Sequence, residues 1–123
     1  MRAFNAREVV LATTLLPLAL GKGWISKTVL LNGMAYHGAS ALGMSVAPLL
    51  RKVDVLCNVS FCVLVNAQTQ WQPHTGLLTA LAVAAWGGAH AAKTVGRHQV
   101  SCLLHATLVQ WPLLLCLSMS PYA

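Results

Sequence analysis

Long uncharged stretches separated by short polar turns dominate the chain. When histidine is counted as neutral, no charged residue interrupts residues 28–50, 55–92 or 98–123. A membrane-spanning helix needs about 20 apolar residues, so each stretch is long enough for one crossing and the middle stretch could hold two. The pattern therefore predicts an all-α fold built from transmembrane helices.

Turn signals divide these stretches into five apolar segments. We expect turns at Arg51–Lys52, at QTQWQPHTG and at KTVGRHQ. The first segment contains Pro17 and is short for a crossing at about 1.5 Å per residue, so it is expected to be a short fifth span or an interfacial helix. The sequence thus predicts a single integral membrane helical bundle over residues 1–123, with four transmembrane helices and this N-terminal apolar helix. The expected segments are residues 8–21, 26–50, 53–69, 76–94 and 99–119.

The composition leads to the same expectation. The chain is 57% hydrophobic and only 8% charged, whereas soluble domains carry about 25% charged residues. A soluble helical bundle, the alternative, needs charged outer faces that these residues cannot supply. Lipid or other apolar protein is therefore the expected surrounding of most of the surface.

The basic residues predict an orientation. If all five segments span, six basic residues share one side of the membrane and two share the other, whereas four lie on each side if the first segment does not span. The positive-inside rule favours the uneven split, with the N-terminus on the basic, inner face. The net charge of +6 comes from basic residues in ones and twos, so no nucleic-acid partner is expected. The residues of the basic side are Arg2, Arg7, Arg51, Lys52, Lys93 and Arg97.

Two segments carry a small residue at every fourth position. This spacing places the small residues on one face of a helix, where another backbone can approach closely. The prediction is that these faces pack against other helices, in this chain or in a partner. The residues are Ala35, Ala39, Gly43 and Ala47 in the second segment, and Ala80, Ala84, Gly88 and Ala92 in the fourth.

A polar stripe runs along the third segment through Asp54, Asn58, Cys62 and Asn66. Polar groups facing lipid are costly, so the stripe is expected to face inward or toward a partner. Hydrogen bonds between helices are the plainer interpretation, and a polar path or ligand site is the sharper one. Asp54 itself is expected to cap the start of its helix, close to Arg51 and Lys52.

The histidines admit two interpretations. His37, His90 and His105 are expected to form hydrogen bonds between helices, and His90 and His105 to lie at a depth similar to that of Asp54. On adjacent helices, His90 and His105 could instead ligate haem or form a proton relay with Asp54. Apart from haem, no cofactor and no metal is expected.

No catalytic motif of the hydrolase, zinc-protease or P-loop kind occurs in the sequence, and no paired carboxylates. The leading hypothesis is therefore a non-catalytic membrane subunit with a structural role in a larger complex, whose partners are other membrane subunits and lipids. The expected location is an organelle inner membrane or a viral internal membrane. A haem- or quinone-binding anchor for electron transfer is one alternative. A small channel or transporter lined by the polar stripe is the other.

Overall fold

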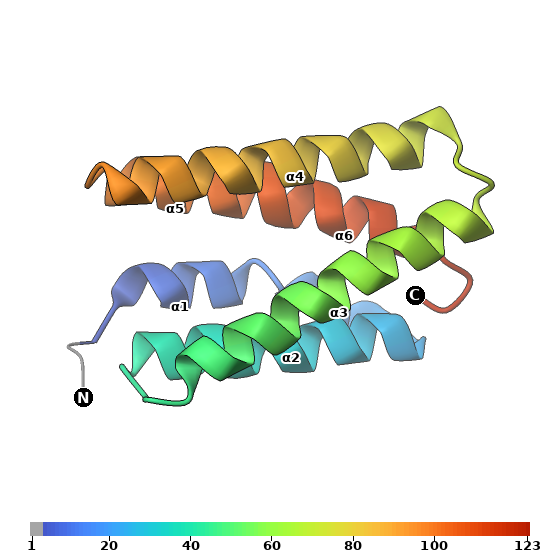
Figure 1. Cartoon of the computed structure of the whole chain (residues 1–123). Coiled ribbons are helices and arrows are strands. Elements are labelled where there is room, and N and C mark those ends of the chain that lie inside the picture. Colours follow the sequence, from blue (N-terminus) through green and yellow to red (C-terminus); the bar gives the residue numbers. More distant parts are fainter. Residues whose placement is uncertain (1–3) are drawn as a thin grey trace.

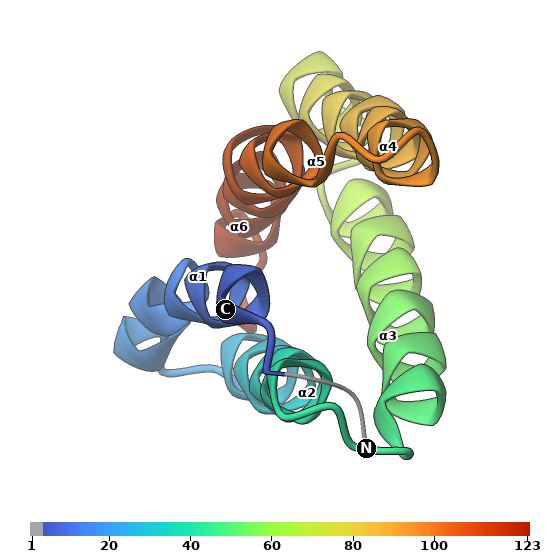
Figure 2. The same cartoon turned by 90° about the vertical axis from the view of Figure 1, so that its left-hand side faces the viewer.

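The computed structural model describes residues 4–123, and these form helices and turns. Arg2 lies outside the described residues. Seen end-on, the helices follow one another in a ring, in the order α1, α2, α3, α4 and then α5 with α6 (Figure 2). The elements are α1 (Ala6–Thr13), η1 (Leu16–Leu20), α2 (Trp24–Ala41), α3 (Ala47–Gln68), α4 (Pro73–Thr94), α5 (His98–Leu104), the π-helix η2 (His105–Gln110) and α6 (Trp111–Ser118).

The second predicted segment was given the wrong C-terminal end. Residues 26–50 do not form one helix, because α2 ends at Ala41 and α3 begins at Ala47. Gly43 lies in the turn between them with φ of 66°, a left-handed conformation that glycine adopts without steric cost. Pro48 lies in the first turn of α3, as suits a residue with fixed φ and no N–H. Arg51 and Lys52 are therefore helical and do not form a turn.

The N-terminal segment is not a single helix. The α-helix α1 ends at Thr13, and a 3-10 helix containing Pro17 follows from Leu16 to Leu20. Thr13 and Thr14 bond their hydroxyls back to the carbonyls of Val10 and Leu11, a local bonding pattern that competes with helix continuation. The resulting pieces are too short to form the fifth span that the sequence predicted.

The last two α-helices are joined by η2 into one continuous helix, His98–Ser118. A proline inside a helix lacks an N–H and clashes with the carbonyl four residues earlier, here that of Leu108. The wider π-turn of η2 comes immediately before Pro112, where the chain has room to relieve that clash. The helix thus accommodates Pro112 by a local widening.

The predicted bundle of four or five transmembrane helices is wrong. Among residues 4–123, only the helix His98–Ser118, with 21 residues, is both long and apolar enough to cross a membrane. Buried core helices have the same length and composition, and 39% of this one is buried. The error has a physical cause: a stretch without charges is not necessarily apolar. The helices α2 and α4 contain histidine, threonine and glycine as well as Lys27 and Lys93, and α3 contains two asparagines together with Arg51, Lys52 and Asp54.

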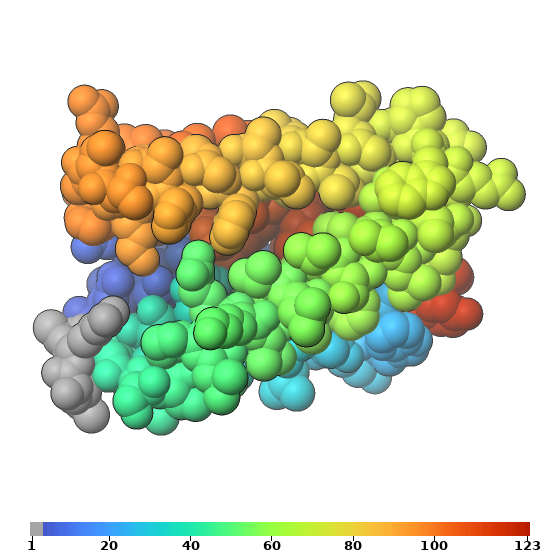
Figure 3. Space-filling view, in the orientation of Figure 1, coloured from blue at the N-terminus to red at the C-terminus, as the bar shows by residue number. Residues whose placement is uncertain are grey.

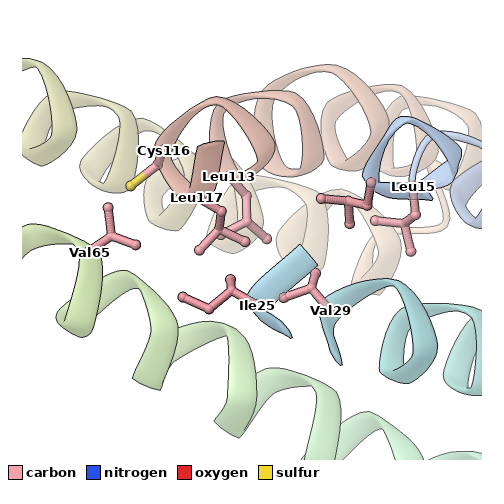
Figure 4. Packing of buried hydrophobic residues seen from close by; sticks show 8 residues of the cluster. Leu15, Ile25, Val29, Val65, Leu113, Cys116 and Leu117 are labelled. Carbon is pink, nitrogen blue, oxygen red and sulfur yellow. The ribbon is translucent and has the colours of Figure 1, made fainter. Parts of the chain in front are cut away.

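An apolar cluster closes one end of the bundle (Figure 4). Side chains from η1, α2, α3 and α6 meet there, and Ile25, Cys116 and Leu117 are fully buried. Beside this cluster, the Thr69 and Thr75 hydroxyls lie 3.0 Å apart across the α3–α4 turn. The opposite end holds the start of α1, the α2–α3 turn and the α4–α5 turn (Figure 1). The cluster consists of Leu15, Leu18, Ile25, Val29, Val65, Leu113, Cys116 and Leu117.

Candidate ligand-binding cleft

The helices α3 and α4 pack together near their connecting turn and diverge toward the other end of the bundle (Figures 1 and 2). A cleft of about 390 Å³ lies between them, and α1, α2, η2 and α6 complete its walls. The hollow is visible between α3 and α4 in the space-filling view (Figure 3). Most of its lining is apolar, with a few polar side chains among it. Small-molecule sites have this size and this mixture of lining residues.

The polar stripe predicted on α3 lies on the wall of this cleft. Asp54, Asn58, Cys62 and Asn66 all line it, because four-residue steps keep successive side chains on one face of a helix. Asp54 does not cap α3: it follows the N-cap residue Val46 by two turns, and it is 8% exposed. The stripe therefore supplies the polar groups of the cleft.

Four buried side-chain oxygens of residues that line the cleft have no hydrogen-bond partner. They are Asp54 Oδ1, Asn58 Oδ1, Asn66 Oδ1 and Gln110 Oε1. For Asn66 the orientation of the amide is fixed, because its Nδ2 donates to the Cys62 carbonyl at 2.8 Å and to the Thr79 hydroxyl at 2.9 Å. A buried acceptor without a donor costs about 1–3 kcal/mol. The cleft is therefore short of hydrogen-bond donors.

A carboxylate–imidazole pair forms the wall opposite α3. Glu8 Oε2 lies 2.6 Å from Nδ1 of His37 in a buried contact, so Nδ1 carries the proton. The Nε2 atom of His37 lies 3.2 Å from Nε2 of Gln110. As placed, the amide nitrogen of Gln110 donates to Nε2 of His37. The chain from Glu8 through His37 to Gln110 thus orders one edge of the cleft.

The two carboxylates have opposite pKa shifts. Burial alone would raise the pKa of Glu8, but the hydrogen bond and charge of His37 outweigh it and lower that pKa below its ordinary value. Burial raises the pKa of Asp54, and the nearby His37 and Asn58 offset this only in part. Burial, together with the charge of Glu8, raises the pKa of Tyr36 to about 12. The interactions of Glu8 thus outweigh its burial, whereas those of Asp54 do not, and Asp54 Oδ1 has no partner.

The other two predicted histidines occupy different surroundings. The ring of His105 lies edge-on to that of His37, with 5.7 Å between centroids. His90 is exposed and stacks on Trp86 at 6.4 Å. Both line the cleft, and haem ligation by this pair stays a prediction. Within residues 4–123, no three histidine, cysteine, aspartate or glutamate side chains gather closely enough to hold a metal ion.

The helix faces formed by the small residues at every fourth position do not coincide with the buried faces of their helices. On α4 the buried residues are Thr75, Ala82, Ala85 and Ala89, while Ala80, Ala84 and Gly88 are exposed and Ala92 is half-buried. In the second segment, Ala39 is buried and Ala35 is exposed, and the line breaks where α2 ends before Gly43 and Ala47. Packing of these residues against a partner stays a prediction.

The pairing of Glu8 with His37 was missed in the sequence. Glu8 is one of two acidic residues and lies in an otherwise apolar stretch, so its need for an internal partner was a usable signal. The pair resembles the acid–histidine half of a catalytic triad, but Nε2 of His37 meets the amide of Gln110 and not a hydroxyl or thiol nucleophile. What this group can do chemically is hold a proton and position hydrogen bonds.

No protein-family model, curated protein or solved structure matches this chain.

Proposed function

We propose that this chain is a small-molecule-binding protein whose ligand is mostly apolar and carries at least one hydrogen-bond donor. The observation that carries the proposal is the set of unpaired oxygens on the wall of one cleft of about 390 Å³. A donor group in the cleft would supply a missing hydrogen bond to Asp54, Asn58 or Asn66. An apolar body would meanwhile remain against side chains such as Val55, Val59 and Val109.

The energetics favour binding for two reasons. Apolar surface removed from water contributes roughly 25 cal/mol per Å². A donor that reaches a buried, unpaired acceptor also removes a penalty that the unliganded protein bears. The ligand does not have to break an existing pair, because Asp54 and Asn66 each have a free acceptor.

Calorimetric titration with two matched probes tests the proposal. Hydrocinnamyl alcohol and its methyl ether share a phenylpropyl body and an oxygen, but only the alcohol can donate. We expect the alcohol to bind about fivefold more tightly, as one net hydrogen bond is worth about 1 kcal/mol. Equal affinities for the two probes would contradict the proposal.

Matched variants locate the preference. Asn66→Leu and Asn58→Leu each remove an unpaired oxygen from the cleft wall and should reduce the preference for the alcohol. Asn32→Leu makes the same exchange on α2, at a residue that does not line the cleft, and should leave the preference unchanged. If Asn32→Leu reduced the preference for the alcohol as much as the other two variants do, the probe would bind outside the cleft.

A second proposal is that the chain is a non-catalytic subunit of a larger assembly, as the sequence suggested. Its support is the number of large apolar side chains that remain exposed, among them Leu56, Leu77 and Leu103 at 64–70%, together with the exposed small-residue line of α4. Contiguous exposed apolar surface commonly marks an interaction site. Gly88→Leu should then weaken association with the native partners in co-purification, and unchanged association would remove this support.

A further inference from the structure

Few charged residues line the cleft, and only some of them have a partner of opposite charge. The chain has only two acidic residues, and both, Glu8 and Asp54, are buried in the cleft wall. Three exposed cations line the same cleft from three different helices: Arg7 on α1, Arg51 on α3 and Lys93 on α4. A molecule in this part of the cleft therefore meets buried negative charge and exposed positive charge at once.

Asp54 and Arg51 lie on the same helix, and neither forms a salt bridge among the described residues, as is also true of Arg7 and Lys93. Glu8 is paired with His37, whereas no salt bridge to Asp54 is present among the described residues and its Oδ1 makes no hydrogen bond. The guanidinium of Arg51 does not turn to Asp54. It lies across the cleft, 5.9 Å from the ring centre of Trp86 on α4, as cations do over aromatic faces.

Arg51 and Asp54 leave α3 on the same side, and the long side chain of Arg51 carries its guanidinium across the cleft. Three residues separate Arg51 from Asp54 on α3, which corresponds to about 4.5 Å of rise along the axis and to the same side of the helix. The backbone positions that carry an anion receptor and a cation receptor thus lie about one helical turn apart. The two charges of an α-amino acid are separated by a single carbon, so both can be reached from one position.

We infer, on the basis of the proposed function, that the ligand is an apolar α-amino acid. Its ammonium group donates to Asp54, its carboxylate accepts from Arg51 at the mouth of the cleft, and its apolar side chain lies along the valine-rich wall. A buried carboxylate without a partner is costly, and hydrogen bonds between charged groups are roughly twice as strong as neutral ones. The ligand satisfies both unpaired groups while bringing no net charge into the cleft.

Lys93 and Arg7 explain why a zwitterion fits better than a simple amine. They add positive charge at the mouth, which opposes a ligand that carries only a cation. In a zwitterion, the carboxylate next to the ammonium group is attracted by these same cations. The same pair of carboxylates, Glu8 and Asp54, opposes a ligand that carries only an anion.

Four probes with the same phenyl body separate these contributions in calorimetric titrations of the full chain. They are L-phenylalanine, phenethylamine without the carboxylate, hydrocinnamate without the ammonium group, and uncharged hydrocinnamyl alcohol. We expect L-phenylalanine to bind at least about tenfold more tightly than the alcohol, because charge-assisted bonds replace neutral ones. Phenethylamine and hydrocinnamate should both bind more weakly than L-phenylalanine.

Charge-removing variants assign each contribution. Asp54→Asn should abolish the advantage of L-phenylalanine over hydrocinnamate, and Arg51→Gln its advantage over phenethylamine. Lys52→Gln is the control, because Lys52 is a neighbouring exposed cation that does not line the cleft, and it should change neither. Circular dichroism of each variant verifies the helical fold, which Asp54→Asn should retain since it removes a buried charge.

The outcomes separate this inference from the proposed function. If L-phenylalanine binds no more tightly than the alcohol, or if hydrocinnamate binds as tightly as L-phenylalanine, the amino-acid assignment is overturned. The proposed function survives either result so long as the alcohol still binds more tightly than its methyl ether. If that preference is missing as well, both proposals fail together.

Discussion

The two ends of the bundle are built from the same helices, but they are filled in opposite ways. At the closed end, α3 and α4 meet at their turn, and leucine, isoleucine and valine side chains from four elements form a continuous apolar cluster (Figure 4). At the open end the two helices separate, and carboxylates, histidines and amides line the cleft between them. Most polar groups at the closed end are paired, with Asn66 Oδ1 as an exception, whereas the open end leaves oxygens of both Asp54 and Asn58 unpaired.

The difference shows which part of the sequence provides stability and which part is available for binding. Threonine hydroxyls and the Asn66 amide join α3 to α4 beside the apolar cluster, so this region holds the helices together. The open end keeps Asp54 buried without a cation, which costs stability. Substitutions at the closed end should therefore weaken the fold, and some at the open end should strengthen it.

The largest effect is expected from Leu117→Ala at the closed end. Leu117 is fully buried, and removing such a side chain from a packed core costs about 2–5 kcal/mol in the free energy of unfolding. Leu115→Ala, two residues away at a side chain that is 53% exposed, should cost less than about 1 kcal/mol. Denaturant titrations of both variants measure the difference, and equal losses would mean that the cluster is not the core.

A smaller loss is expected from Glu8→Leu, which leaves His37 buried without its partner. Breaking a buried pair costs about 3 kcal/mol. Glu8→Gln should cost less, because its amide oxygen can still accept from Nδ1 of His37.

The effect of Glu8 on stability should also depend on pH. Since the pKa of Glu8 is lowered in the fold, its stabilising effect is present above the ordinary value of 4.5 and is lost as the pH falls through the lowered pKa. Thermal unfolding across this pH range should therefore show the loss from Glu8→Leu shrinking in acid; a pH-independent loss would contradict the pairing.

The smallest effect, and one of opposite sign, is expected from Asp54→Asn. Burial raises the pKa of Asp54, so the carboxyl ionises more readily in the unfolded chain, and the folded state loses stability as the pH rises above the ordinary value of 3.8. The variant cannot ionise. Its melting temperature should match that of the wild type in acid and exceed it increasingly toward neutral pH. A variant that is less stable than the wild type at neutral pH would mean that Asp54 has a cationic partner.

The sequence predicted the helical class and the inward polar face of α3, because both depend on local spacing. Four-residue steps from Asp54 to Asn66 place those side chains together in any regular helix. The membrane prediction was wrong because uncharged residues were treated as apolar ones. Histidine and threonine within α2 and α4 lower their hydropathy without interrupting an uncharged stretch, and α3 includes Arg51 and Lys52, which were expected in a turn.

Other features could not be read from local patterns. The pairing of Glu8 with His37 joins residues 29 positions apart, and it depends on how α1 packs on α2. The turn at Gly43 was hidden because glycine also fits a small-residue helix face, so the same residue supported a continuous helix. The divergence of α3 from α4, which creates the cleft, follows from packing at the far end of the bundle and has no signature in either helix.

The most direct test of the account is whether a donor-bearing ligand reaches the polar wall that α3 contributes to the cleft. Side-chain amide signals of the asparagines and glutamines can be followed by nitrogen–proton NMR while hydrocinnamyl alcohol is added to the full chain. The account predicts saturable shifts of the Asn58 and Asn66 amide signals, with no shift of Asn32, and little response when the methyl ether replaces the alcohol. Unchanged Asn58 and Asn66 signals, or an equal response of Asn32, would contradict the claim that the open cleft is a binding site.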